Sequence, residues 1–221
     1  MPRGLPAAVQ IGLNSRRAVA SVLPFATASA DLVQVYAVKL PIGKTLTIDW
    51  GDGNSDDYAG NNTTSVAVTH TYAGAGSYDI IFKGDYTDLT YLLCNSNSLS
   101  GDVSGWSSLT SLTYLNCRSN SLTGDVSGWS ALTSLTVLSC RSNSLDFDNT
   151  TAWAALSLGT TCYLQNNSMT STQVDNALIA FAGGPFLNTT ITLSGTNAAR
   201  TSDSDAAVTT LEANGCTIIT S

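Results

Sequence analysis

A single phrase recurs along the middle of this sequence and limits what the chain can fold into. The segments that begin at Leu89, Leu112 and Leu135 share the pattern L-x-x-L-x-C-x-x-N-x-L, and successive copies start 23 residues apart. A fixed period of this length is the sequence signature of repeat proteins, in which each unit buries its apolar side chains against the next unit. The repeat therefore predicts a stacked core with an exposed face on which binding is expected.

The pattern resembles the leucine-rich repeat. The resemblance implies a short solenoid in which the leucines and the cysteine of each copy face inward, while the asparagine bonds backbone groups of the adjoining turn. A drifted fourth copy keeps its asparagine at Asn167, with Cys162 in a leucine place and Leu164 in the cysteine place. Two helices are predicted after it, capped by Ser171 and Ser202, and each precedes a short strand.

Residues 31–86 are typical of antiparallel strands. Turn-rich segments separate four runs of alternating apolar residues, which are LVQVYAVKL, KTLTIDW, SVAVTHTY and GSYDIIFKG. The constellation IDWGDG followed by VTHTYAGAGSYDIIFKG resembles the PKD-like (polycystic-kidney-disease-type) domain, which has an Ig-like fold; Trp50, His70 and Tyr78 are among the matching residues. This resemblance implies a surface scaffold used for spacing and adhesion, without catalysis.

These segments predict a mainly β fold with some α-helix. Residues 1–30 are expected to form an N-terminal arm or anchor, and residues 31–86 a small antiparallel β-sandwich of the PKD-like kind. Residues 87–221 are expected to form a short leucine-rich-repeat solenoid with a helical C-terminal cap. The cap is expected because a terminal repeat has to close an otherwise open core.

The first 30 residues allow two interpretations. They contain three arginines and no acidic residue, and they end in a short apolar run and Ala-Ser-Ala. That composition is typical of a secretory signal cleaved after Ala30, but Pro24 interrupts the apolar run. We expect an anchoring arm that packs on other subunits, with a cleaved signal peptide as the alternative.

Charge and composition exclude several classes of function. The chain after residue 30 has 6 basic and 16 acidic side chains, hence a net charge of −10, which argues against binding of nucleic acid. No run of 18 apolar residues occurs, so membrane insertion is not expected. The repeated cysteines fit reduced core thiols, and without a Cys-x-x-Cys motif or a Cys/His cluster we expect no metal and no cofactor.

Catalysis is not expected either. His70 is the only histidine, and no nucleophile with an orienting acid marks a catalytic set, so a structural role within the β region is favoured. The aspartates around the Gly-Asp-Gly turn lack the order of a calcium loop and are expected to cap turns. A glycan hydrolase would need paired carboxylates, and the repeat face carries none.

The outward positions of the repeat strands form the candidate binding surface. Side chains next to inward residues in a strand point to solvent, and Tyr and Arg are the usual anchors of interfaces. Arg118 and Arg141 are the only basic residues between Lys83 and Arg200, which fits an acidic or polar ligand; an unremarkable solvated face is the equally weighted alternative. The predicted partner-binding residues are Tyr91, Tyr114, Asn116, Arg118, Arg141 and Tyr163.

A row of tryptophans offers a second candidate surface. Trp106 and Trp129 recur with the repeat, and Trp153 is expected to continue the row. Packing beneath the opposite face is the favoured interpretation, and a row for stacking carbohydrate is the alternative.

The C-terminal segments ITLSGTNAA and AAVTTLEANGCTIITS resemble the ends of repeat proteins from bacteriophage structural components and bacterial surface proteins. The resemblance implies a non-enzymatic virion structural or attachment protein, oligomeric within an assembly. It would contact other virion proteins through residues 1–30 and a host surface protein or glycan through the repeat face. The alternative is a secreted bacterial cell-surface adhesin.

Overall fold

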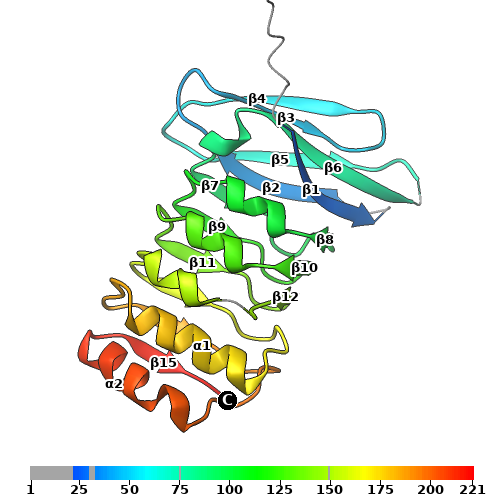
Figure 1. Ribbon diagram of the computed structural model, residues 1–221. Coiled ribbons are helices and arrows are strands. Elements are labelled where there is room, and N and C mark those ends of the chain that lie inside the picture. Colours follow the sequence, from blue (N-terminus) through cyan, green and yellow to red (C-terminus); the bar gives the residue numbers. More distant parts are fainter. Residues whose placement is uncertain (1–21, 30–32, 75, 149) are drawn as a thin grey trace, which may run out of the picture.

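The computed structural model describes residues 22–29, 33–74, 76–148 and 150–221, and its fold is mainly β with some helix. Two sheets extend along the stack of elements (Figure 1). In spatial order, sheet A contains β12 (Ser144–Asp146), β10 (Ser121–Asp125), β8 (Ser100–Asp102), β1 (Val22–Ser29), β6 (Ser77–Gly84), β3 (Thr45–Asp49) and β4 (Ser55–Ala59). Sheet B contains β15 (Thr217–Ile219), β14 (Thr190–Thr192), β13 (Thr161–Tyr163), β11 (Val137–Ser139), β9 (Tyr114–Asn116), β7 (Tyr91–Leu93), β2 (Val33–Lys39) and β5 (Val66–Thr71).

Residues 22–86 supply the antiparallel part of both sheets. The four expected runs form β2, β3, β5 and β6, and their alternation places Leu46, Ile48 and Phe82 in the core. β4 lies in a segment predicted to be turns, and it forms a hairpin with β3. This strand reads Ser-Asp-Asp-Tyr-Ala and lies at the sheet edge, so burial imposes no clear alternation on it.

Part of the expected N-terminal arm is also a strand. β1 pairs with β6 along its length and with β8 at Thr27, so it joins the antiparallel part of sheet A to the repeats. Leu23 of this strand is buried. Residues 1–21, which make up most of the expected arm, lie outside the described residues.

Residues 87–221 supply the parallel part. Tyr91, Tyr114 and Val137 are neighbours across sheet B, so adjacent strands are one repeat apart. The inward residues expected in the first three copies are buried, as are Cys162 and Leu164 of the drifted copy, and this part of the prediction is confirmed. These inward residues are Leu89, Leu92, Cys94, Leu99, Leu112, Leu115, Cys117, Leu122, Leu135, Leu138, Cys140 and Leu145.

The antiparallel and parallel parts share one core. β2 pairs with β7, and β1 with β8, so both sheets continue across residue 87, where the sequence analysis placed a boundary. The buried hydrophobic side chains form one cluster that extends from Leu23 to Cys216. The antiparallel part therefore covers the apolar end of the first repeat.

Asparagine side chains occupy the interior of each turn, as the repeat pattern predicted. Asn120 Oδ1 accepts from Asn97 N and Leu99 N, each at 3.0 Å. Its Nδ2 donates to Cys94 O at 3.0 Å and to Cys117 O at 2.9 Å. Asn143 and Asn167 bond the backbone in the same way, and Asn197 continues the series one unit further than expected.

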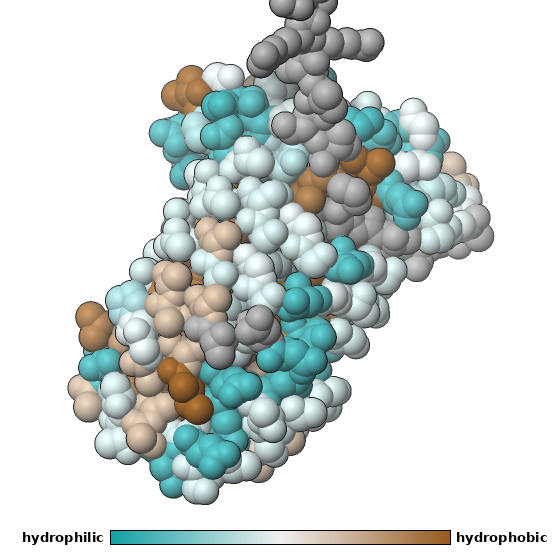
Figure 2. All heavy atoms as spheres, viewed as in Figure 1, coloured by the Kyte–Doolittle hydropathy of each residue, from teal (hydrophilic) through white to brown (hydrophobic). Residues whose placement is uncertain are grey.

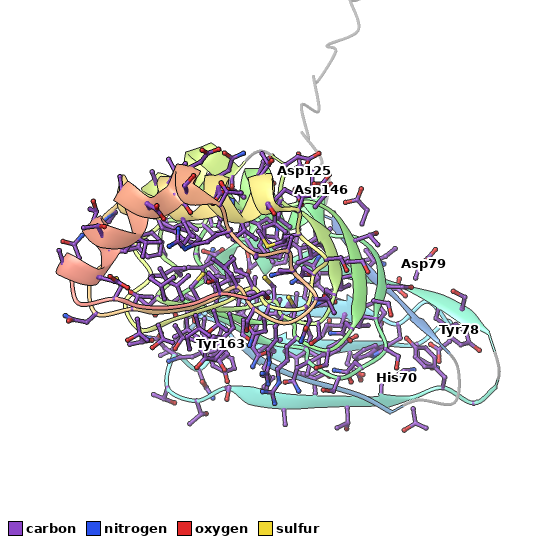
Figure 3. The ribbon with its side chains drawn as sticks, turned by 90° about the horizontal axis from the view of Figure 1, so that it is seen from below. His70, Tyr78, Asp79, Asp125, Asp146 and Tyr163 are labelled. Carbon is purple, nitrogen blue, oxygen red and sulfur yellow. The ribbon has the colours of Figure 1, made fainter. Side chains whose placement is uncertain are left out.

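Helices line the side of the stack opposite sheet B (Figures 1 and 3). Thr170, one residue before the predicted cap Ser171, forms a capping box with Gln173. Thr201, one residue before the predicted cap Ser202, accepts from Asp203 N and caps a short 3-10 helix that precedes the last α-helix. No described helix has the length and apolarity needed to cross a membrane. The helices are η1 (Tyr86–Asp88), η2 (Ser104–Ser108), η3 (Ser127–Ala131), η4 (Thr150–Ala155), α1 (Ser171–Ala182), η5 (Ser202–Ser204) and α2 (Asp205–Ala213).

The asparagine series gives the first testable prediction. Replacing Asn120 with Leu leaves two backbone N–H groups and two carbonyls without their partner, so we expect Asn120→Leu to lower the free energy of unfolding by about 3 kcal/mol or more. Asn95→Leu is the matched control, because the Asn95 amide bonds only the neighbouring Ser96 side chain. Urea denaturation of both variants provides the measurement, and equal stabilities would contradict a structural role for the ladder.

Candidate binding face

Four of the six predicted binding residues fall on two outward rows of sheet B, and Arg118 and Arg141 each lie two residues after the end of a strand of that sheet. Tyr91 and Tyr114 share the first row with Val137 and Thr161. The second row contains Leu93, Asn116, Ser139 and Tyr163. In Figure 3, Tyr163 lies on the far side of the stacked strands from the helices. The residue between the rows on each strand is fully buried, so the strands present these rows to the outside.

A shallow depression of about 360 Å³ occupies the centre of this face. Small side chains on β11 lie between Tyr114 of β9 and Tyr163 of β13, and this difference in size leaves the space. Four of the predicted residues line the depression, whereas Tyr91 and Arg141 lie beside it. Three further residues line the depression but were not among the predicted binding residues: Val137, Ser139 and Thr161. Small residues in register between tyrosines are the sequence signal for such a hollow.

Tyr114 and the Asn116 amide form one wall and part of the floor, and Tyr91 supports this wall from outside the depression. The rings of Tyr91 and Tyr114 stack with centroids 4.3 Å apart and planes 12° from parallel. Burial, and then the neighbouring Tyr114, raise the pKa of Tyr91, so its phenol stays neutral at physiological pH. Asn116 is only 8% exposed, and its Nδ2 donates to Tyr114 Oη at 3.4 Å. The wall is therefore a partly fixed aromatic surface with an amide beneath it.

The two arginines of this face lie on adjacent repeats. Ser119 N donates to Arg141 O at 2.9 Å, which keeps the segments after β9 and β11 in register. Both arginines are partly exposed, and the ion pairs among the described residues involve neither of them. Two like charges at one level of neighbouring strands repel each other, so an anion bound between them would be stabilising.

Acidic side chains are concentrated on another side of the molecule. Asp125 and Asp146 are exposed, neighbour each other in sheet A, and in Figure 3 lie near the helices and far from Tyr163. In Figure 2, hydrophilic residues gather along the side where β10 and β12 lie in Figure 1. Each carboxylate caps its own turn, since Asp125 accepts from Ser127 N and Asp146 from Asp148 N. The described chain therefore separates this acidic flank from the arginines of sheet B.

The tryptophan row is buried, which excludes the alternative that it stacks carbohydrate. Trp106, Trp129 and Trp153 are each 0% exposed. The first two rings are stacked 6.0 Å apart. The indole N–H of Trp129 donates to Val103 O at 3.3 Å, and that of Trp153 to Val126 O at 3.0 Å. This row is a structural element beneath the short helices, as the favoured interpretation predicted.

His70 belongs to a compact polar and aromatic group in the antiparallel part. Its Nε2 lies 2.9 Å from Asp52 Oδ2, and its ring stacks on Trp50 with centroids 4.7 Å apart. Tyr72 Oη donates to Trp50 O at 3.0 Å. Although burial raises the pKa of Asp52, hydrogen bonds from Asn54 and His70 outweigh burial and hold it below its usual value. The group fixes the Gly-Asp-Gly turn, and Figure 3 places His70 well away from Tyr163.

No protein-family model matches this chain, and neither a curated protein nor a solved structure matches it. The interpretation of the strand face therefore depends on its own geometry and chemistry. The residues that carry it are the aromatic wall, the polar floor and the two arginines described above.

The repeated thiols give a prediction about reactivity. Burial raises the pKa of Cys117 to about 12, and burial also raises the pKa of Cys94, Cys140 and Cys162. Because the thiolate is the reactive species, we expect these thiols to resist Ellman's reagent at pH 8 in the folded protein. Titration in denaturant should reveal all five cysteines. Rapid labelling of any of the four under native conditions would contradict the buried arrangement.

Proposed function

We propose that this chain is a non-enzymatic attachment protein that binds a partner through the outward face of sheet B. The observation that carries the proposal is the depression of about 360 Å³, flanked by Tyr114 and Tyr163 and bordered by Arg118 and Arg141, neither of which forms an ion pair with another described residue. A rigid sheet suits this role, because side chains held in register on strands lose little freedom when a ligand binds.

In this proposal, residues 87–221 form a leucine-rich-repeat solenoid with a helical end, and a PKD-like β-sandwich precedes it. The one-repeat offset between strands and the asparagine series support the solenoid. The contacts of His70 with Asp52 and of Tyr72 with Trp50 support the PKD-like assignment, since they link residues on which that resemblance rests.

The proposed setting is the surface of a virion, with a bacteriophage capsid or tail as the preferred assembly. Residues 1–30 would anchor the chain to other virion proteins, and the strand face would meet a host surface protein or glycan. The secreted adhesin remains the alternative. The position of β1 favours the first proposal, because cleavage after Ala30 would remove a strand that lies between β6 and β8 in sheet A.

A double variant tests the binding face. Tyr114→Ala with Arg118→Ala removes one wall and one cation of the depression while leaving the inward leucines untouched, so attachment should fall at least tenfold and thermal stability should change little. Retention of fluorescently labelled protein on a panel of bacterial cells measures the first effect, and circular dichroism measures the second.

The matched control is Tyr58→Ala with Lys44→Ala. It also removes one aromatic ring and one cation, from β4 and the loop before β3. The exposed ion pairs of Lys44 with Asp85 and Asp88 are expected to contribute little to stability, so their loss in this variant should have little effect. Unchanged attachment of the Tyr114/Arg118 variant, beside an unchanged control, would remove the strand face from consideration.

Truncation tests the choice between arm and signal. A chain that begins at Asp31 lacks β1, exposes the edges of β6 and β8 and loses buried Leu23, so its melting temperature should fall by about 5 °C or more. A chain that begins at Val22 separates this effect from that of the preceding residues. N-terminal sequencing of native material completes the test, because a mature start at Asp31 with full stability would favour the secreted adhesin.

A further inference from the structure

We propose that the depression on sheet B binds a carboxylate-bearing sugar residue of a surface polysaccharide. This inference rests on the proposed attachment function and names the chemical class of its ligand. Three properties of the depression lead to it: an unbalanced pair of cations, an aromatic wall beside polar side chains, and a size suited to a sugar unit.

The cations select an anion. Arg118 lines the depression, and Arg141 follows it on the next repeat, with no described carboxylate paired to either. A bound carboxylate would offset their mutual repulsion. Arginine suits this task, because its planar guanidinium donates two parallel hydrogen bonds to the two oxygens of a carboxylate. The acidic flank of sheet A lies elsewhere, so it does not neutralise this face.

The walls select a sugar ring. A pyranose presents C–H groups on its faces and hydroxyl groups around its rim, so it needs an aromatic surface and hydrogen-bonding groups close together. Tyr114 supplies the surface, and its stacking on Tyr91 fixes the ring. Thr161 supplies a hydroxyl group in the same depression, and the largely buried Asn116 and Ser139 contribute polar atoms to its floor. A small number of well-positioned polar groups within a concave site usually fixes the orientation of a small ligand.

The same lining disfavours a folded protein as the ligand. Protein interfaces commonly have an apolar centre, whereas Val137 is the one residue lining this depression whose side chain carries no polar group. The large hydrophobic side chains that are exposed among the described residues lie outside the depression; they are Ile42, Ile179, Leu187 and Ile219. A volume of about 360 Å³ lies at the lower end of the range for small-molecule sites.

Binding to carboxylated polysaccharides tests the inference. The probes are polysialic acid, oligogalacturonate, hyaluronan and alginate, each used before and after chemical reduction of its carboxyl groups to alcohols. We expect the full chain to bind at least one carboxylated probe and to bind its reduced form at least tenfold more weakly. Dextran sulfate is included to distinguish a carboxylate site from general attraction to polyanions.

Variants locate the binding. Arg118→Gln with Arg141→Gln should weaken binding of the carboxylated probe at least tenfold, Arg118→Lys should weaken it less, and Arg200→Gln, which alters a cation on the helical side, should leave it unchanged. Calorimetry at two salt concentrations provides the affinities, because a site with two cations should weaken as salt increases.

Several results would overturn the inference. The first is that the chain binds none of the carboxylated probes, and the second is that it binds a reduced probe as tightly as its carboxylated form. The third is an affinity for dextran sulfate equal to that for the best carboxylated probe. The fourth is full binding of the carboxylated probe by the double arginine variant. The proposed attachment function would survive these results if the Tyr114/Arg118 variant still lost attachment to cells, since a protein ligand would then be indicated. If cell attachment also persisted in that variant, the function itself would fail.

Discussion

The asparagine ladder is the interaction on which the stack depends. Each repeat has to turn sharply after its strand, and a serine then adopts a left-handed conformation, with φ of 56° or 57° at Ser96, Ser119 and Ser142. Such a turn leaves backbone groups directed toward the interior, where water cannot bond them. One asparagine side chain satisfies several of these groups in two successive repeats, as Asn120 does for the turn at Asn97. The ladder thereby fixes the distance and register between repeats.

That register determines what the outer face can do. Because adjacent strands are one repeat apart, side chains at equivalent positions of successive repeats become neighbours in space. A substitution in one repeat therefore changes the surface locally. Val137 stands where the preceding copies have tyrosine, which opens the depression beside Tyr114. Arg118 and Arg141 occupy the same position of successive repeats and therefore lie side by side. The shape and charge of the face arise from the differences and identities among copies.

The antiparallel part contributes the first boundary of the stack. β2 and β1 pair with the first strands of the repeat region, so an edge that would otherwise be open is covered by hydrogen-bonded strands. At the other end, α1 and α2 replace the short helices and enlarge the apolar layer, with Phe181 packed near Trp153. Both ends depart from the repeat because a terminal unit has a neighbour on one side only.

The sequence by itself determined the inward leucines and cysteines, the asparagine series and the outward rows, since a strict period makes every copy solve the same packing problem. It did not determine β1 or β4, because neither strand carries a clear alternation and each is defined by pairing with a distant segment. It named Tyr114, Asn116, Arg118 and Tyr163 but did not unite them, and it favoured packing of the tryptophans without excluding an exposed row. Only the tertiary structure decided these points, because a depression and a buried layer depend on side chains from several strands or helices brought together in space.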